Sequence, residues 1–238
     1  MPAERISGNA RALRVAGLYA VTPDVDDTAL LLAKVAAALD GGAAVVQYRN
    51  KALAPEASRR QAAALARMHA VRGGGLFIVN DDPQLAVDVD ADGVHLGEDD
   101  AGIASARACV GSDRLIGVSC YGDFDRACDA VRQGADYVAF GSFFASPVKP
   151  HARRADIALL RRARSLGVPL VAIGGITAGN ASGLIDAGAD AVAVISDVFA
   201  HDDLPSVTRA SSAIAALFAS RATAERVDEH RRAAPRCE

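Results

Sequence analysis

Residues 76–100 read LFIVNDDPQLAVDVDADGVHLGEDD, and this stretch decides the fold. Two short apolar runs, 76–79 and 93–96, are each followed by acidic residues, and a segment that can begin a helix at Pro83 separates them. An apolar run of this length, bounded by glycine before it and acids after it, is typical of a buried strand. The stretch therefore predicts a strand–helix–strand unit with two neighbouring parallel strands.

The acidic ends of both runs fall at one edge of the predicted sheet. Parallel neighbours lie about 4.8 Å apart, so we expect Asp81 and Asp100 at that edge together. Two carboxylates with few further protein ligands suit Mg²⁺, which keeps waters and takes other ligands from substrate phosphates. The alternative is that Asp82 and Asp100 cap helices, which aspartate does well. The stretch alone leaves both interpretations open.

Echoes of this stretch recur along the chain. The segments GAAV at 42–45, ADGV at 91–94, GADYV at 134–138 and GADAV at 188–192 each lead into an apolar run. A spacing of roughly 50 residues corresponds to one strand–helix–strand–helix unit, repeated four times. The predicted strands begin at Leu18, Ala43, Leu76, Gly93, Leu115, Tyr137, Leu170 and Ala191. This count predicts an α/β fold, a single-domain TIM (β/α)8 barrel. An open doubly wound sheet is the second interpretation, but its G-x-G-x-x-G loop is missing after the first strand.

Length and composition agree with one barrel. We place the barrel at residues 17–219, between an N-terminal extension (1–16) and a polar, flexible C-terminal tail (220–238). The net charge of −3 argues against a nucleic-acid partner, and no apolar run suits a signal peptide or a membrane span. The four cysteines have no zinc spacing and are expected to be reduced thiols. We therefore expect a cytoplasmic protein with small-molecule substrates and no membrane partner; a homo-oligomer is compatible with the sequence.

Polar residues at the strand ends are the candidate site, because a TIM barrel places its active site there. The second predicted strand is followed by the run QYRNK at 47–51. Strand alternation puts Gln47, Arg49 and Lys51 on one side of the chain. A guanidinium and an ammonium group at the barrel mouth would hold a polyanion such as a diphosphate. For Lys51 taken alone, an ordinary exposed cation is the simpler interpretation.

Loops after the last three predicted strands carry groups suited to phosphate. The loop after the sixth strand is longer than a minimal turn, and long loops on this face are usually functional. The seventh strand ends at Gly174-Gly175 and the eighth at Ile195-Ser196. Exposed backbone N–H groups beside a small hydroxyl match the phosphate position of many barrels. His95 receives no role, and Cys120, which has no evident activating base, is interpreted as a small apolar residue.

Taken in order, these motifs resemble the thiamine-phosphate synthase family, also called thiamine-phosphate pyrophosphorylase. The matching motifs are LYAVT at 18–22, QYRNK at 47–51, IVNDD at 78–82, ADGVHLG at 91–97, GADY at 134–137, AIGGI at 172–176 and VIS at 194–196. The resemblance implies a transferase of thiamine biosynthesis. Such an enzyme joins hydroxymethylpyrimidine diphosphate to hydroxyethylthiazole phosphate, releases pyrophosphate and uses Mg²⁺.

The resemblance also implies the site residues. The pyrimidine diphosphate would be bound by Gln47, Arg49, Lys51, Asn80, Ser119 and Lys149. The thiazole phosphate would be bound by Ser146, Gly175, Ile195 and Ser196, and Mg²⁺ by Asp81 and Asp100. The implied mechanism is dissociative, with pyrophosphate leaving before the thiazole nitrogen captures the carbocation. Arg49, Lys51 and Lys149 would then be catalytic, because cations stabilise the leaving group.

Two residues depart from the family pattern. Val148 stands where threonine is usual, and Glu98 stands where glutamine is usual. Loss of a phosphate-binding hydroxyl at position 148 would cost about 1.5 to 3 kcal/mol, whereas the sign of the effect of Glu98 on the metal site is open. The rival functions are a thiazole tautomerase and a non-catalytic paralogue that binds thiamine phosphate and regulates a partner. The retained cations and acids favour the synthase.

Overall fold

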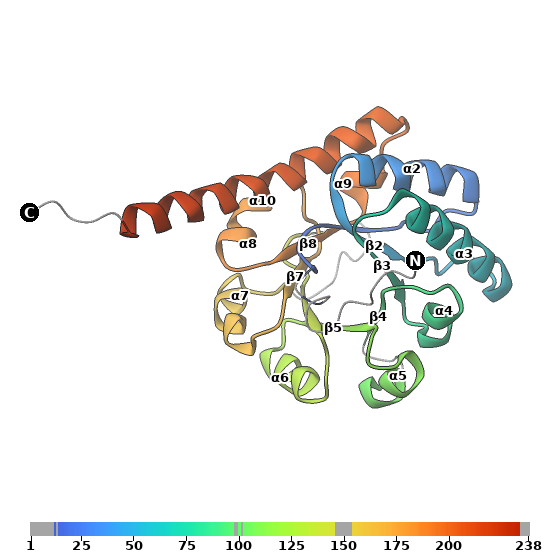
Figure 1. Cartoon of the computed structure of the whole chain (residues 1–238), viewed down its shortest axis with the longest axis horizontal. Coiled ribbons are helices and arrows are strands. Elements are labelled where there is room, and N and C mark those ends of the chain that lie inside the picture. Colours follow the sequence, from blue (N-terminus) through green and yellow to red (C-terminus); the bar gives the residue numbers. More distant parts are fainter. Residues whose placement is uncertain (1–11, 13, 98–99, 101, 146–153, 234–238) are drawn as a thin grey trace, which may run out of the picture.

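The computed structural model describes residues 12, 14–97, 100, 102–145 and 154–233, the last of these from residue 221 onward as backbone only. Within these residues, eight parallel strands form one closed barrel in the order β1 to β8 (Figure 1). The helices surround the barrel on its outside, as Figure 1 shows along the barrel axis. The predicted TIM barrel is confirmed, and the doubly wound alternative is wrong.

The strands are β1 (Gly17–Val21), β2 (Ala43–Tyr48), β3 (Leu76–Asn80), β4 (Gly93–Leu96), β5 (Leu115–Tyr121), β6 (Tyr137–Gly141), β7 (Leu170–Ile173) and β8 (Ala191–Val194). The helices are α2 (Thr28–Asp40), α3 (Pro55–Arg72), α4 (Pro83–Asp88), α5 (Ile103–Val110), α6 (Phe124–Arg132), α7 (Ala158–Ala163), α8 (Ser182–Asp186), α9 (Ser196–Phe199) and α10 (Leu204–Ala233), with the 3-10 turn η1 (Arg164–Leu166) after α7. Every predicted strand start agrees with the structure to within one residue, because short apolar runs are bounded by turn residues here.

The stretch 76–100 folds as the strand–helix–strand unit that its pattern predicts. Strands β3 and β4 pair in parallel, with Asn80 opposite His95. Asp82 caps α4, since its carboxylate accepts a hydrogen bond from the N–H of Leu85 at 2.9 Å. The capping interpretation is thus right for Asp82 and wrong for Asp100, because the N-cap of α5 is Gly102.

The barrel interior is filled by one cluster of buried side chains that includes two tyrosines. Tyr19 and Tyr137 are both fully buried in it. A Cβ atom at Gly117 would lie 1.9 Å from the Tyr137 ring, so only glycine at this position of β5 avoids a clash with the ring. Ala12 and Val15 join the same cluster from the end at which the strands begin, which closes that end of the barrel.

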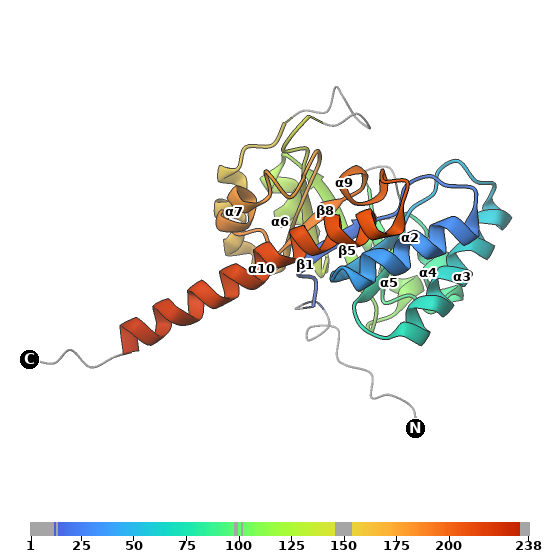
Figure 2. The same ribbon diagram turned by 90° about the horizontal axis from the view of Figure 1, so that it is seen from above.

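Helix α10 packs beside α2 and then continues beyond the barrel, as Figures 1 and 2 both show. The Thr208 hydroxyl donates to the Ala37 carbonyl at 3.1 Å, and a Cβ atom at Gly41 would lie 2.5 Å from Cβ of Ser211. We expected a polar tail from residue 220, and the backbone is helical as far as Ala233. The division of the chain into extension, barrel and tail stays a prediction. None of the described helices is both long and apolar enough to span a bilayer.

Candidate active site

The loops after β1 and β2 are tied together at the rim where the strands end. The N–H of Arg49 donates to the Thr22 hydroxyl at 2.8 Å, and that hydroxyl donates back to the Arg49 carbonyl at 2.8 Å. The Asp24 carboxylate accepts from the N–H of Lys51 at 2.8 Å and from the Arg49 guanidinium at 3.2 Å. Asp24 therefore orients the Arg49 guanidinium and fixes the backbone at Lys51. Sequence reasoning missed this residue, although it follows β1 at the same edge at which Asp81 follows β3.

An ion pair joins the loops after β2 and β3. The Lys51 ammonium nitrogen lies 3.0 Å from a carboxylate oxygen of Asp81. Asp81 has φ of 65°, a left-handed conformation that is uncommon for a residue other than glycine. Its N–H donates to the His95 carbonyl at 2.8 Å, which fixes this turn at the end of the strand pair. Backbone of this kind costs about 1 to 3 kcal/mol and is concentrated at functional sites.

The second predicted metal ligand completes a pair of carboxyl groups. Asp100 accepts a hydrogen bond from the N–H of Gly97 at 2.5 Å and shares another with the Asp81 carboxyl group. Burial raises the pKa of Asp100, the hydrogen bond and the charge of Asp81 raise it further, and the Gly97 N–H and Lys51 oppose the rise. The charge of Asp81 therefore disfavours ionisation of Asp100, and a cation bound beside Asp100 would favour it.

These two acids fit the predicted Mg²⁺. Their oxygen atoms are the hard donors that this ion prefers. Within the part of the chain that the structure describes, no group of three or more His, Cys, Asp or Glu residues could hold a metal ion. A cation at Asp81 and Asp100 would therefore complete its shell with waters and phosphate oxygens. Glu98, one of the departures from the family pattern, lies outside the described residues.

Three further predicted residues lie at the ends of strands around the same mouth. Gln47, at the end of β2, is 5% exposed, and its amide donates to the Tyr19 hydroxyl at 2.8 Å. The Ser119 hydroxyl, on β5, lies 2.9 Å from Nε2 of His95. Asn80 is the last residue of β3. The structure thus brings together Gln47, Arg49, Lys51, Asn80, Asp81, Asp100 and Ser119 at one end of the barrel.

Arg126 on α6 supports this mouth from the outside. Its Nε donates to the Ser119 carbonyl at 2.9 Å, and its Nη2 donates to the Gly97 carbonyl at 3.4 Å. Arg126 thus connects the ends of β4 and β5, next to the Gly97 N–H that donates to Asp100. Nothing in the strand pattern pointed to this residue, because its partners are backbone atoms of two separate strands.

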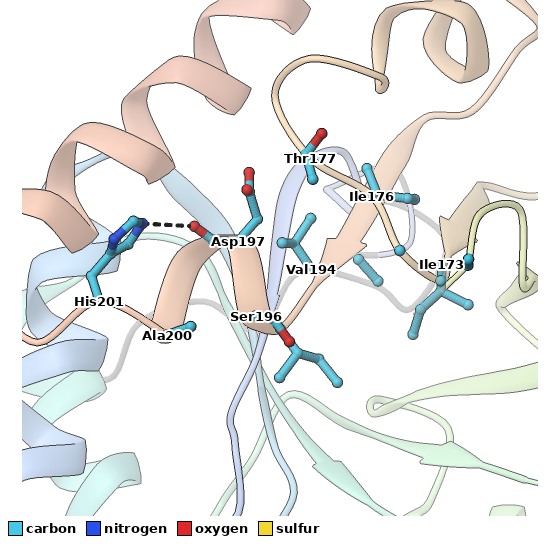
Figure 3. A pocket seen from close by; sticks show the side chains of 13 residues that line it. Ile173, Ile176, Thr177, Val194, Ser196, Asp197, Ala200 and His201 are labelled. Carbon is cyan, nitrogen blue, oxygen red and sulfur yellow. Dashed lines mark hydrogen bonds between the residues drawn. The ribbon is translucent and has the colours of Figure 1, made fainter. Parts of the chain in front are cut away.

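A cavity of about 440 Å³ lies at the ends of β7 and β8. Three residues predicted for phosphate, Gly175, Ile195 and Ser196, line it. Figure 3 shows Ile173, Ile176 and Thr177, from β7 and its loop, on one side and Val194, Ser196 and Asp197, from β8 and α9, on the other.

Glycine is required in the turn after β7. Gly174 has φ of 106° and Gly175 has φ of 62°. A Cβ atom at Gly174 would lie 2.0 Å from the Ser142 hydroxyl, and one at Gly175 would lie 2.3 Å from the Ala145 carbonyl oxygen. The backbone of this turn therefore lies directly against the loop after β6. Two other predicted residues, Ser146 and Lys149, lie outside the described residues, as does Val148.

The polar part of this cavity includes side chains that sequence reasoning missed. Thr177, Asp197 and His201 are among the lining residues. The Asp197 carboxylate accepts from the N–H of Ala178 at 3.1 Å, and Nε2 of His201 lies 3.1 Å from the Asp197 carbonyl oxygen (Figure 3). The first contact joins α9 to the loop after β7, and the second lies within the α9 segment. Thr177 and Asp197 follow the motifs AIGGI and VIS directly, which is the signal that could have found them.

Cys120 is buried and carries no chemistry. Burial raises the pKa of its thiol to about 12, and Asp123 and Cys128 raise it further while Arg126 opposes them. A thiol of this kind stays protonated at neutral pH and is a poor nucleophile. The described cysteines, Cys109, Cys120 and Cys128, are all free.

Comparisons with known proteins agree over nearly the whole barrel. The family model for thiamine monophosphate synthase matches residues 18–198. The thiamine-phosphate synthase of Methylobacillus flagellatus is 52% identical over 195 residues, which cover 82% of this chain and 93% of that protein. That of Thiobacillus denitrificans is 53% identical over 205 residues, covering 86% and 95%. Among solved structures, the thiamine phosphate pyrophosphorylase from Pyrococcus furiosus is similar at a TM-score of 0.77 with 31% identity, covering 88% of this chain and 98% of that one.

Proposed function

The chain belongs to the thiamine monophosphate synthase family, and we propose that the mouth of its barrel performs the family's reaction with the residues described above. The protein is a transferase of thiamine biosynthesis. Its reaction joins hydroxymethylpyrimidine diphosphate to hydroxyethylthiazole phosphate and gives thiamine phosphate and pyrophosphate. A cytoplasmic location and a homo-oligomeric state stay predictions from the sequence.

One observation carries the assignment of residues: a cation and two acids converge at the ends of three adjacent strands. Lys51 contacts Asp81, and Asp81 contacts Asp100. A diphosphate needs cations for its oxygens, and Mg²⁺ needs carboxylates together with those same oxygens. The two requirements meet within one set of side chains, so we infer that the diphosphate binds across them.

Loss of pyrophosphate is the step that these residues assist. As the carbon–oxygen bond to the diphosphate breaks, negative charge grows on the leaving oxygens. Arg49 and Lys51 neutralise that charge, and Asp24 orients the Arg49 guanidinium and holds the backbone of Lys51 before the substrate arrives. Mg²⁺ held by Asp81 and Asp100 would act as a Lewis acid on the same oxygens. Lys149 has the same role in this proposal.

The thiazole phosphate is assigned to the cavity at β7 and β8. Its lining includes Gly175, Ile195 and Ser196, which in this proposal give backbone N–H groups and a hydroxyl to the phosphate. The volume of about 440 Å³ is within the usual range for a small-molecule site. The two substrates then bind at neighbouring strand ends of one barrel, with the thiazole nitrogen directed at the pyrimidine methylene carbon. Ser146 would add a further hydroxyl to the phosphate.

The test is release of pyrophosphate by the purified full-length protein, with each substrate and Mg²⁺ omitted in turn. We expect release only when all three are present. Asp81→Asn and Arg49→Ala should each lower the rate by about a hundredfold or more, because each removes one contact to the leaving group or its metal. The matched control is Asp40→Asn, which breaks the Arg72 ion pair outside the barrel mouth and should leave the rate unchanged.

Three results would contradict this proposal in different ways. Release of pyrophosphate at the full rate without Mg²⁺ would show that the reaction does not use a metal at this site. Tight binding of thiamine phosphate with no release under any condition would point instead to the non-catalytic paralogue. Equal rates in Asp81→Asn and Asp40→Asn would move the active site away from the acids.

A further inference from the structure

A line of hydrogen bonds crosses the barrel interior between two of the proposed substrate-binding groups. It starts at Gln47, whose amide donates to the Tyr19 hydroxyl at 2.8 Å. The Tyr19 hydroxyl lies 2.9 Å from that of Tyr137. The Tyr137 hydroxyl lies 3.1 Å from Nδ1 of His95, and Nε2 of His95 lies 2.9 Å from the Ser119 hydroxyl. The five side chains come from five different strands.

The middle of this line is sealed from solvent. Tyr19 and Tyr137 are 1% and 0% exposed, and His95 is 9% exposed. The His95 ring stacks on the Tyr137 ring with centroids 5.6 Å apart, and Gly117 leaves the Tyr137 ring its space. Tight packing on both sides keeps each hydroxyl within reach of its partner. These polar groups therefore satisfy one another or remain unsatisfied at a cost of about 1 to 3 kcal/mol each.

Each group in the line has a limited number of hydrogens to give. Burial raises the pKa of Tyr19 and of Tyr137, so each phenol keeps its single hydrogen. His95 is buried and its two ring nitrogens face the hydroxyls of Tyr137 and Ser119, so burial between neutral partners favours the uncharged imidazole. A neutral imidazole donates from one nitrogen and accepts at the other. The line can consequently be satisfied in only two ways, with all hydrogens directed one way or all the other way.

The two directions present different groups to a ligand. With the Gln47 amide N–H donating into the line, Tyr19 donates to Tyr137, Tyr137 donates to Nδ1 of His95, and Nε2–H donates to Ser119. The Ser119 hydrogen is then free to donate to a ligand. In the reverse direction Ser119 donates to His95, and the line ends at the Gln47 amide oxygen. Ser119 then has no hydrogen for a ligand.

We propose that Tyr19, Tyr137 and His95 form a one-way hydrogen-bond relay that couples Gln47 to Ser119 and keeps the Ser119 hydroxyl as a donor toward the diphosphate. This inference rests on the proposed function, which assigns Gln47 and Ser119 to the pyrimidine diphosphate. Diphosphate oxygens only accept hydrogen bonds, so only the first direction serves them. Tyr19, Tyr137 and His95 act through the two end residues and are positioning residues.

The relay predicts the tautomer of His95 directly. In the ligand-free wild-type protein, ¹⁵N NMR of the histidine side chains should find His95 with hydrogen on Nε2 and none on Nδ1. The signal is assigned by its loss in His95→Gln, which separates it from the other four histidines. The opposite tautomer would overturn the proposed direction. This measurement needs no turnover, so it stands whether or not the proposed function does.

Coupling between the end residues is the kinetic test. In the wild-type background, kcat/KM for the pyrimidine diphosphate is measured for Gln47→Ala, Ser119→Ala and the double variant. We expect the loss of kcat/KM in the double variant to be smaller than the product of the two single losses by about threefold or more. The reason is that Gln47→Ala already removes the donor that sets the direction of the hydrogen bonds. The same cycle in a Tyr137→Phe background should be multiplicative, because the line is cut in its middle. Multiplicative losses in both backgrounds would overturn the relay.

Tyr137→Phe alone gives a simpler measurement with a matched control. It should lower kcat/KM by about five- to tenfold, the cost of one weakened hydrogen bond to the ligand. Tyr48→Phe removes another buried phenol, one that bonds Ser58 and Gln61 outside the barrel interior, and should leave kcat/KM unchanged. Equal kinetic losses in both variants would assign Tyr137 a general structural role. If the wild type released no pyrophosphate, the proposed function would fail, and the NMR result alone would decide the relay.

Discussion

Lys51 and Asp81 form an ion pair at the barrel mouth, with the ammonium nitrogen 3.0 Å from a carboxylate oxygen. In the proposed function, the first residue serves the diphosphate and the second serves the metal. The pair therefore changes partners when the substrate and Mg²⁺ bind. Lys51 is 58% exposed, so the pair itself contributes about 0 to 1 kcal/mol to stability. The pair matters because, once it breaks, Lys51 can bind the diphosphate and Asp81 can bind Mg²⁺.

We expect Lys51→Met to act in opposite directions on metal binding and on turnover. Without the lysine, Asp81 has no competing cation, so the affinity of the free protein for Mg²⁺ should rise by up to about fivefold. The turnover rate should fall by about a hundredfold, because a charge opposite the leaving group is lost. Titration calorimetry with Mg²⁺ and pyrophosphate release measure the two quantities. A parallel fall in both would show that Lys51 supports the metal site instead of competing with it.

Asp100→Asn should separate stability from activity. A carboxyl group whose pKa is raised in the folded state binds more protons there than in the unfolded state, so its ionisation at neutral pH opposes folding. Removing that charge should raise Tm at pH 7 in metal-free buffer. The increase in Tm that Mg²⁺ gives the wild type should disappear, and turnover should fall by about a hundredfold or more. Thermal unfolding with and without Mg²⁺ tests this; a lower metal-free Tm would contradict it.

Gly175→Ala should weaken the thiazole phosphate site more than its backbone strain alone explains. The added methyl group would meet the Ala145 carbonyl oxygen at 2.3 Å. We expect a loss of stability above 2 kcal/mol and a raised KM for the thiazole phosphate, with KM for the pyrimidine diphosphate unchanged. Gly167→Ala is the matched control, because Gly167 is likewise left-handed, with φ of 70°, but has nothing within 4 Å of the new Cβ atom. It should cost about 1 to 2 kcal/mol, with normal kinetics; equal stability losses in the two variants would contradict the contact.

The sequence predicts the strands and the rim residues well, because both depend on local pattern. Each strand is a short apolar run, and polar residues directly after it must fall at the same end of a parallel barrel. The residue pattern does not distinguish a helix cap from a rim acid at Asp100, and in the structure the N-cap of α5 is Gly102. The relay could not be predicted, because the hydroxyls of Tyr19 and Tyr137 meet across 118 residues of chain. Arg126 was missed for a similar reason, since it binds backbone carbonyls that a residue pattern does not mark.

His69 should make the fold less stable in acid. The residue is 8% exposed, its ring lies 5.8 Å from that of Phe77, and neither ring nitrogen has a hydrogen-bond partner in the described residues. Burial lowers the pKa of His69 below 6.5; Asp92 and the neighbouring Gly75 backbone oppose this effect, and Arg14 adds to it. Below pH 6.5 the unfolded chain therefore binds the proton that the folded chain resists. The resulting stability is fully present above that pH and is lost as the pH falls beneath it.

The measurement is the free energy of unfolding in urea at several values between pH 7 and about pH 5, for the wild type and for His69→Leu. Leucine keeps an apolar contact with Phe77 and has no proton to bind. The slope of the unfolding free energy against pH should therefore be smaller in His69→Leu. Part of the slope that remains comes from protonation of His95, whose pKa burial lowers to about 4. His69→Gln keeps a polar side chain without titration, so it should show the reduced slope together with a lower stability at every pH. Equal slopes in the wild type and in both variants would show that His69 is protonated without cost to the fold.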